Sequence, residues 1–159
     1  MLKSLEEKFC VYCNSKNLEI NQNQLNVIKK LQDYNHKNFK SFYYYFFFKE
    51  PSKKSFYLYG DVGVGKTMIL DFFYNFINVK KKRLHFNEFM LNFHDFVNSR
   101  KEKKEQNIIN LFVKNLKSEA SLIYFDEFQV TNIVDAMILG KLFEEIFKEN
   151  IKIILTSNT

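Results

Sequence analysis

The sequence contains little glycine, proline or cysteine, and it has no long run of apolar residues. Its 159 residues include four glycines, one proline and two cysteines. The longest unbroken apolar run, FYYYFFF at residues 42–48, is far shorter than the roughly 18 residues that a membrane-spanning helix needs. The first ten residues, MLKSLEEKFC, carry acids where a secretory signal would be apolar. We therefore expect a cytoplasmic protein without a transmembrane segment.

The shortage of cysteine argues against a structural zinc site. Cys10 and Cys13 form a single CxxC pair, and such a site needs a second pair of ligands at suitable spacing. The three histidines, His36, His85 and His94, are scattered along the chain. We therefore predict two reduced thiols on an amino-terminal helix.

The net charge of +6 is spread over small basic clusters, such as KKKR at residues 80–83 and KEKKE at residues 101–105. Such clusters occur on nucleic-acid or anionic-membrane surfaces, and also in solvated loops and helix ends. The aromatic run at residues 42–48 fits either base stacking or packing before a core strand. We favour solvation for the charges and packing for the aromatic rings, so a nucleic-acid partner is not our main expectation.

From residue 55 onward, short apolar strands alternate with helices. We predict strands at residues 55–60, 83–86, 121–125 and 151–157, and helices at residues 66–77, 87–100, 107–117 and 132–150. The strands are almost continuously apolar, which is typical of a parallel sheet covered by helices on both faces. The sequence therefore predicts an α/β core at residues 51–159, preceded by a helical region at residues 1–50.

Three of the four glycines lie in one stretch, GDVGVGKT at residues 60–67. Gly60, Gly65, Lys66 and Thr67 satisfy the pattern GxxxxGK[ST] between a predicted strand and a predicted helix. Glycine lets the backbone wrap around phosphate oxygens, and the amides at the helix start point at the anion. We predict Lys66 on the β- and γ-phosphates and Thr67 as a Mg²⁺ ligand. The expected contact residues are Gly60, Asp61, Val62, Gly63, Val64, Gly65, Lys66, Thr67 and Met68.

Two adjacent acids end a later apolar strand, in LIYFDEF at residues 122–128. Asp126 would hold the hydration shell of Mg²⁺, and Glu127 would polarise the attacking water as a general base. The GTPase pattern, in which Gly follows such an Asp by two residues, is absent. We therefore predict ATP and Mg²⁺ as the cofactors, with Asn158 at the end of the last strand orienting the water.

These motifs, in this order, resemble the AAA+ class of P-loop ATPases. More narrowly, residues 57–74, 80–90 and 123–147 are similar to the ZapE and AFG-like ATPase family, and the resemblance covers about residues 20–159. Residues 125–130 and 135–137 with Gly140 are its most specific part, whereas Asn87 stands where the family pattern leads us to expect His. The resemblance implies an ATPase that assembles with itself. In bacteria it also implies a protein partner near the division ring, peripheral to the inner membrane, and mitochondrial relatives are linked to the turnover of respiratory-chain proteins.

The resemblance further implies elements after residue 159, namely a fifth core strand beside the first, an arginine finger and a helical lid. The only arginines, Arg83 and Arg100, precede the strand that ends in the acids. We therefore expect an amino-terminal portion that binds nucleotide but turns it over slowly, with residues 57–59 on an unpaired edge.

Two other functions stay open. A helicase-loader or initiator ATPase of the same class would bind single-stranded DNA in a salt-sensitive manner. A nucleotide-sensing interaction module would bind ATP without useful catalysis. A Glu127→Gln variant separates the second function from an ATPase, because only an ATPase has turnover to lose.

Overall fold

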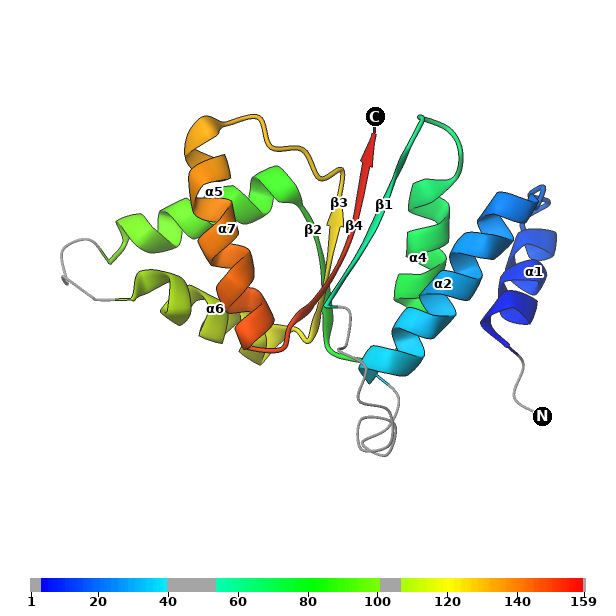
Figure 1. The fold of residues 1–159 in the computed structure, drawn as a ribbon, viewed down its shortest axis with the longest axis horizontal. Coiled ribbons are helices and arrows are strands. Elements are labelled where there is room, and N and C mark those ends of the chain that lie inside the picture. Colours follow the sequence, from blue (N-terminus) through cyan, green and yellow to red (C-terminus); the bar gives the residue numbers. More distant parts are fainter. Residues whose placement is uncertain (1–3, 40–53, 101–106, 159) are drawn as a thin grey trace.

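The computed structural model describes residues 4–39, 54–100 and 107–158 (Figure 1). The aromatic run at residues 42–48 and the basic cluster at residues 101–105 lie outside these ranges, so their predicted roles stay predictions. So does the division at residue 50, since residues 40–53 also lie outside the described part. No helix among the described residues is both long and apolar enough to cross a bilayer.

A parallel sheet of four strands forms the centre of the described structure. The order is β1-β4-β3-β2, and the strands are β1 (Ser55–Gly60), β2 (Lys81–His85), β3 (Leu122–Asp126) and β4 (Lys152–Asn158). The register places Gly60 beside Asn158 and His85 beside Asp126, so the carboxyl ends of all four strands meet at one edge. Among the described strands β1 pairs only with β4, as the edge prediction required.

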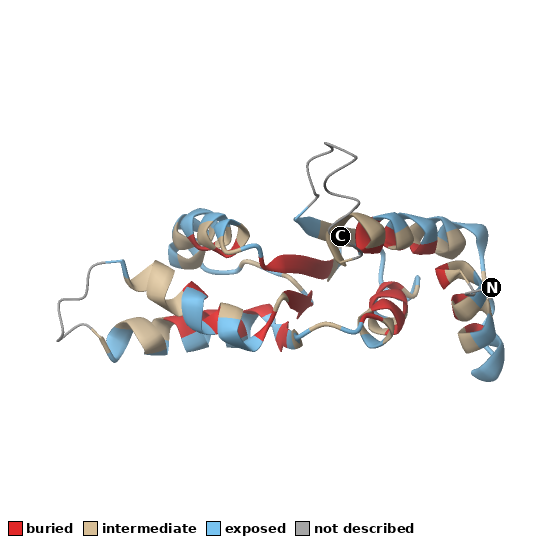
Figure 2. Ribbon diagram, turned by 90° about the horizontal axis from the view of Figure 1, so that it is seen from below, coloured by how far each residue is buried: buried red, intermediate tan, exposed pale blue. Residues whose placement is uncertain are grey.

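Helices cover both faces of the sheet, and the predicted α/β fold is confirmed (Figure 1). One layer contains α1 (Leu5–Ser15), α2 (Gln22–Phe39) and α4 (Lys66–Phe76), and the other contains α5 (Phe86–Asn98), α6 (Ile108–Glu119) and α7 (Ile133–Lys148). Figure 2 shows the buried strands between the two layers. Successive strand side chains face opposite layers: Tyr124 packs with the α1, α2 and α4 core, and Phe125 packs with the α5, α6 and α7 core.

The amino-terminal helices pack on the helix that follows β1. The ring of Phe9 on α1 makes an edge contact with Phe72 of α4, at 5.1 Å between centroids. The start of α1 is fixed by a capping box, in which Ser4 and Glu7 each accept the backbone N–H of the other. Both cysteines are free and lie on α1, as predicted. Burial raises the pKa of the Cys13 thiol, with a smaller contribution from Cys10.

The basic cluster at residues 80–83 corrects two predictions. The strand that contains it begins earlier than predicted, because Lys81 pairs with Leu122, and Phe86 already belongs to α5. The cluster also lies mainly on this strand and not in a loop, although the side chains of Lys82 and Arg83 stay 42% and 40% exposed. Lys81 Nζ donates to the carbonyl of Ile77 at 2.6 Å, Lys82 pairs with Glu119, and Arg83 pairs with two acids described below. Internal partners therefore take up these charges.

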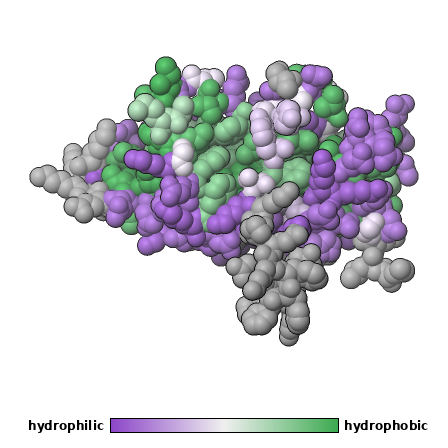
Figure 3. Space-filling view, in the orientation of Figure 1, coloured by the Kyte–Doolittle hydropathy of each residue, from purple (hydrophilic) through white to green (hydrophobic). Residues whose placement is uncertain are grey.

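On the face of the molecule that Figure 3 draws, most of the hydrophobic surface lies toward one side. Figure 3 shows green, hydrophobic surface toward the α5–α7 side, whereas the α1–α2 side is mostly purple and hydrophilic. Three large apolar side chains near the start of α7 are exposed, namely Ile133, Val134 and Met137. Exposed apolar groups of this kind are typical of contact surfaces.

Gly140 offers a test of the α7 packing. A Cβ added there meets nothing within 4 Å, and the residue lies inside a helix. We expect Gly140→Ala to raise the free energy of unfolding by about 0.5–1 kcal/mol, because alanine loses less backbone entropy in a helix. Gly63→Ala is the matched control: its Cβ is equally unobstructed, but its φ of +85° strains alanine, so it should destabilise. Denaturant unfolding measures both, and a destabilising Gly140→Ala would contradict the packing.

Candidate functional site

The glycine-rich loop joins β1 to α4 and has the backbone of an anion cradle. Gly63 and Gly65 have φ values of +85° and +89°, which side-chain-bearing residues rarely adopt. Gly65 is the N-cap of α4, and no side chain among the described residues caps this helix. The first N–H groups of α4 are therefore oriented as donors for a ligand at the loop.

Lys66 lies at the base of the loop. Its side chain is largely buried, with 7% of the residue exposed, and Nζ donates to the carbonyls of Gly60 at 2.8 Å and Asp61 at 2.6 Å. These bonds place a cation beside the uncapped helix start. An anionic ligand in the loop would meet that charge together with the α4 amides.

A cavity of ≈ 290 Å³ opens between this loop and the carboxyl ends of β3 and β4. Its lining residues are Val62, Gly63, Gly65, Lys66, Thr67, Met68, Glu127, Thr156, Ser157 and Asn158. A neighbouring cavity of ≈ 320 Å³ shares Glu127 and Asn158 with it. A larger cavity of ≈ 780 Å³ lies between α6 and α7, but no residue of the predicted site lines it. We assign the site to the cavity of ≈ 290 Å³, because the residues of the predicted motifs line it together.

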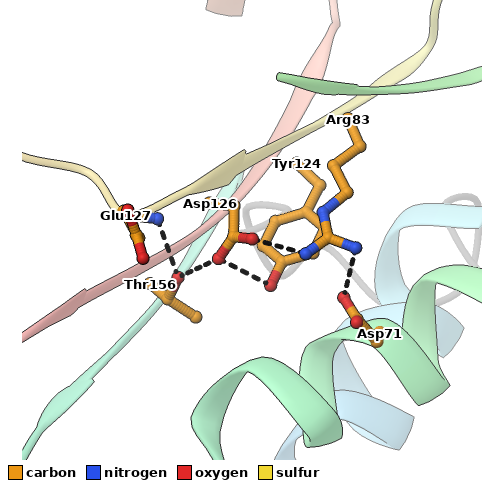
Figure 4. Close-up of polar contacts among 6 residues, drawn as sticks. All are labelled: Asp71, Arg83, Tyr124, Asp126, Glu127 and Thr156. Atoms are coloured by element: carbon orange, nitrogen blue, oxygen red, sulfur yellow. Dashed lines mark hydrogen bonds and ion pairs between the residues drawn. The ribbon is translucent and has the colours of Figure 1, made fainter. Parts of the chain in front are cut away.

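Asp126 is the last residue of β3, and its carboxylate is held by three side chains (Figure 4). Oδ2 accepts a hydrogen bond from Arg83 Nη2, whereas Oδ1 accepts from Thr156 Oγ1 at 3.2 Å and from the Tyr124 hydroxyl at 3.4 Å. Its side chain is 10% exposed. The carboxylate therefore lies just behind the cavity wall that Thr156 forms.

Glu127 follows directly, in a strained conformation. Its φ is +55°, a left-handed value that costs free energy for any residue with a Cβ. Two bonds to Thr156 stabilise it: the Glu127 N–H donates to Thr156 Oγ1 at 3.2 Å, and the Phe128 N–H donates to the Thr156 carbonyl at 2.6 Å. This turn separates the two acids: Asp126 is buried in the protein, and Glu127 is exposed at the cavity.

The polar cluster behind Asp126 continues to α4. Arg83 on β2 forms an ion pair with Asp71 of α4, at 3.0 Å between Nη1 and Oδ1, and its guanidinium carbon lies 5.0 Å from the centre of the Tyr124 ring. Burial opposes the charge of Arg83, but the bond to Asp126 and the charge of Asp71 raise its pKa. Burial also raises the pKa of Asp71 and of Tyr124, so Tyr124 stays a neutral donor.

The residues fit a nucleotide and a magnesium ion in their chemistry. An uncapped helix start, two glycines with positive φ and a buried lysine suit a phosphate chain. Thr67 and Asp126 offer a hydroxyl and a carboxylate, the hard oxygen donors that Mg²⁺ prefers. The chain therefore has the donor groups for both.

Comparison with known proteins gives the family. The sequence model of the AFG1-like ATPase family matches residues 12–159. The chain belongs to this family. It is 43% identical over 115 residues to Lactation elevated protein 1 homolog B of Danio rerio, an alignment that covers 66% of this chain and 23% of that protein. It is 36% identical over 106 residues to Cell division protein ZapE of Escherichia coli K12, which covers 66% of this chain and 28% of that protein.

The chain thus spans about a quarter of the length of these two AFG1-like relatives. Among solved structures, AMPPCP-bound DnaA from Aquifex aeolicus superposes with a TM-score of 0.58 at 18% identity, covering 91% of this chain and 41% of that one. At that identity the likeness shows the shared P-loop fold and does not favour an initiator function.

Most of the residues predicted for the site converge in the structure. Residues 62, 63 and 65–68 line the cavity with Glu127 and Asn158. Gly60, Asp61, Val64 and Asp126 do not line it, although Gly60 and Asp61 bind Lys66 and Asp126 binds Thr156. Their roles toward a ligand stay predictions.

Several residues near the site were not predicted, and one of them, Ser157, lines the cavity. Thr156 bridges both acids, and Arg83 binds Asp126. Gln24, at the start of α2, places Nε2 3.1 Å from the position that a Cβ on Gly65 would occupy. The polar triplet at residues 156–158 was a signal for Thr156, but no sequence pattern connects Gln24 with the loop.

Proposed function

We propose that this chain binds ATP with Mg²⁺ in the cavity beside the glycine-rich loop and hydrolyses it to ADP and phosphate. The observation that carries this proposal is that residues 62, 63 and 65–68 line one cavity together with Glu127 and Asn158. Membership of the AFG1-like ATPase family supports the same reaction. GTP is the less favoured nucleotide, because the acidic strand lacks the GTPase pattern.

Each residue has a role in this proposal. The amides of residues 60–67 and Lys66 bind the phosphate chain, and Lys66 exchanges its loop carbonyls for phosphate oxygens. Thr67 and Asp126 would hold Mg²⁺, which supplies charge neutralisation on the phosphates. Glu127 accepts a proton from the attacking water, and Asn158 orients that water. Thr156 positions Glu127 by fixing its strained backbone.

A role of the ZapE type extends this proposal. One relative is named a cell division protein. We propose a cytoplasmic protein that assembles with itself and meets a protein partner at the division ring or the inner membrane. The exposed apolar side chains near the start of α7 support a protein contact.

Single-turnover hydrolysis tests the enzymatic half of the proposal. Excess protein is mixed with γ-labelled ATP and Mg²⁺, and phosphate release is followed over hours. We expect release from ATP above the protein-free rate, and less release from GTP. Stoichiometric ATP binding without release would overturn hydrolysis by this chain and favour the nucleotide-sensing module. Salt-sensitive single-stranded DNA binding would favour the helicase-loader function.

A further inference from the structure

Arg83 connects the carboxylate of Asp126 with the helix that carries the phosphate-binding residues. Its two terminal nitrogens bind different elements: Nη2 binds Asp126 at the end of β3, and Nη1 binds Asp71 of α4 (Figure 4). The strand register explains this placement, because Arg83 lies beside Tyr124 and the guanidinium lies over the Tyr124 ring. Arg83 therefore reaches the acid from the strand next to it.

This contact leaves little of Asp126 available to a cation. Oδ2 is bound to Arg83, and Oδ1 accepts from Thr156 and from Tyr124. A metal ion or its hydration water must therefore replace one of these donors. Arg83 is the only charged donor of the three, and its bond is the one that a cation opposes most directly.

The balance of charges around Asp126 also indicates that Arg83 limits the binding of a cation there. Asp71 and Asp126 carry two negative charges, and Arg83 supplies one positive charge between them. The Nζ of Lys66, the buried cation at the base of the loop, is bonded to the carbonyls of Gly60 and Asp61. Without Arg83, the carboxylates of Asp71 and Asp126 would lose the cation that pairs with both of them. Such a pair attracts a divalent ion even before nucleotide arrives.

We propose that Arg83 is a positioning residue that occupies the Asp126 carboxylate and keeps the affinity of the nucleotide-free protein for divalent cations low. Mg²⁺ then enters together with the triphosphate, whose charge offsets that of Arg83. This inference rests on the proposed function, because it takes Asp126 as a metal-holding residue. It adds a residue that sets the affinity for divalent cations before nucleotide binds.

Mn²⁺ binding without nucleotide tests the inference, with electron paramagnetic resonance counting free Mn²⁺. We expect Arg83→Gln, which keeps a donor but removes the charge, to lower the Mn²⁺ dissociation constant about tenfold. The effect stays moderate because the Arg83 side chain is 40% exposed and therefore screened. Arg83→Lys keeps the charge and should stay within about twofold of wild type, as should Arg100→Gln, which removes the other arginine.

A double substitution locates the effect. Adding Asp126→Asn to Arg83→Gln should abolish the gain in Mn²⁺ affinity, because the released carboxylate is the ligand. Unchanged or weaker Mn²⁺ binding by folded Arg83→Gln would overturn the inference, and so would a gain that survives Asp126→Asn.

Two further measurements cover misfolding and the underlying function. If the Arg83 variants do not fold, Asp126→Asn alone decides: it should leave nucleotide-free Mn²⁺ affinity unchanged and weaken Mn²⁺ binding once ATP is present. Weakening in both conditions contradicts an occupied carboxylate. Mg-ATP uptake by wild type is measured in parallel. Uptake without any Arg83 effect overturns this inference alone, whereas no uptake overturns the proposed function.

Discussion

Glu127→Gln is expected to slow single-turnover ATP hydrolysis by about 10²- to 10⁴-fold, the contribution of a general base. ATP affinity should change little, because the side chain reaches the cavity from β3 and the phosphate-binding amides belong to α4 and its loop. Glutamine has the same shape and keeps the left-handed backbone that Thr156 stabilises. The substitution therefore removes the base without removing the nucleotide site.

The matched control is Glu88→Gln, an exposed acid in the first turn of α5. It changes the net charge by the same amount and should leave hydrolysis at the wild-type rate. Phosphate release and nucleotide affinity are measured on all three proteins. Equal release by wild type and Glu127→Gln would exclude Glu127 as the base.

Lys66→Ala is expected to weaken Mg-ATP binding by about 10- to 150-fold, because a hydrogen bond to a charged group contributes ~1.5–3 kcal/mol. Lys66 is the buried cation at the base of the loop, and its ammonium would bind the β- and γ-phosphates. Calorimetric titration gives the dissociation constant. The binding of adenosine, which lacks phosphates, should be much less affected.

Two observations guard against a trivial explanation of a Lys66→Ala result. The side chain also tethers the loop through Gly60 and Asp61, so thermal unfolding must show that the variant is folded. Lys82→Ala removes a half-exposed lysine paired with Glu119 and should keep wild-type affinity. Undiminished ATP binding by folded Lys66→Ala would place the phosphates elsewhere.

The sheet and the loop could be predicted because their signals are local. The four strands are short apolar runs with helices between them, and alternation of this kind has few solutions other than a covered parallel sheet. The loop was recognisable because positive φ values at Gly63 and Gly65 require glycine, and this chain has few others. The apolar runs and the glycines of the loop each involve only a few neighbouring residues, so the sequence alone shows them.

The side chains that bind Asp126 and Glu127 could not be predicted, because these contacts depend on the register between strands that are distant in the sequence. Thr156 reaches Asp126 and Glu127 because β4 lies beside β3, and Arg83 reaches Asp126 because β2 lies on its other side. A lysine-rich stretch in a sequence resembles a solvated loop whatever its final partners. In the folded sheet Lys81 donates to the carbonyl of Ile77 near the end of α4, whereas Lys82 and Arg83 pair with acids while staying about 40% exposed.

The central claim is that Mg-ATP binds between the glycine-rich loop and the acids at the ends of the neighbouring strands. Calorimetric titration of the folded wild-type chain with ATP, in the presence of Mg²⁺, tests it most directly. The account predicts saturable uptake at one site per chain, weaker without Mg²⁺. A folded protein that takes up no adenine nucleotide would contradict it.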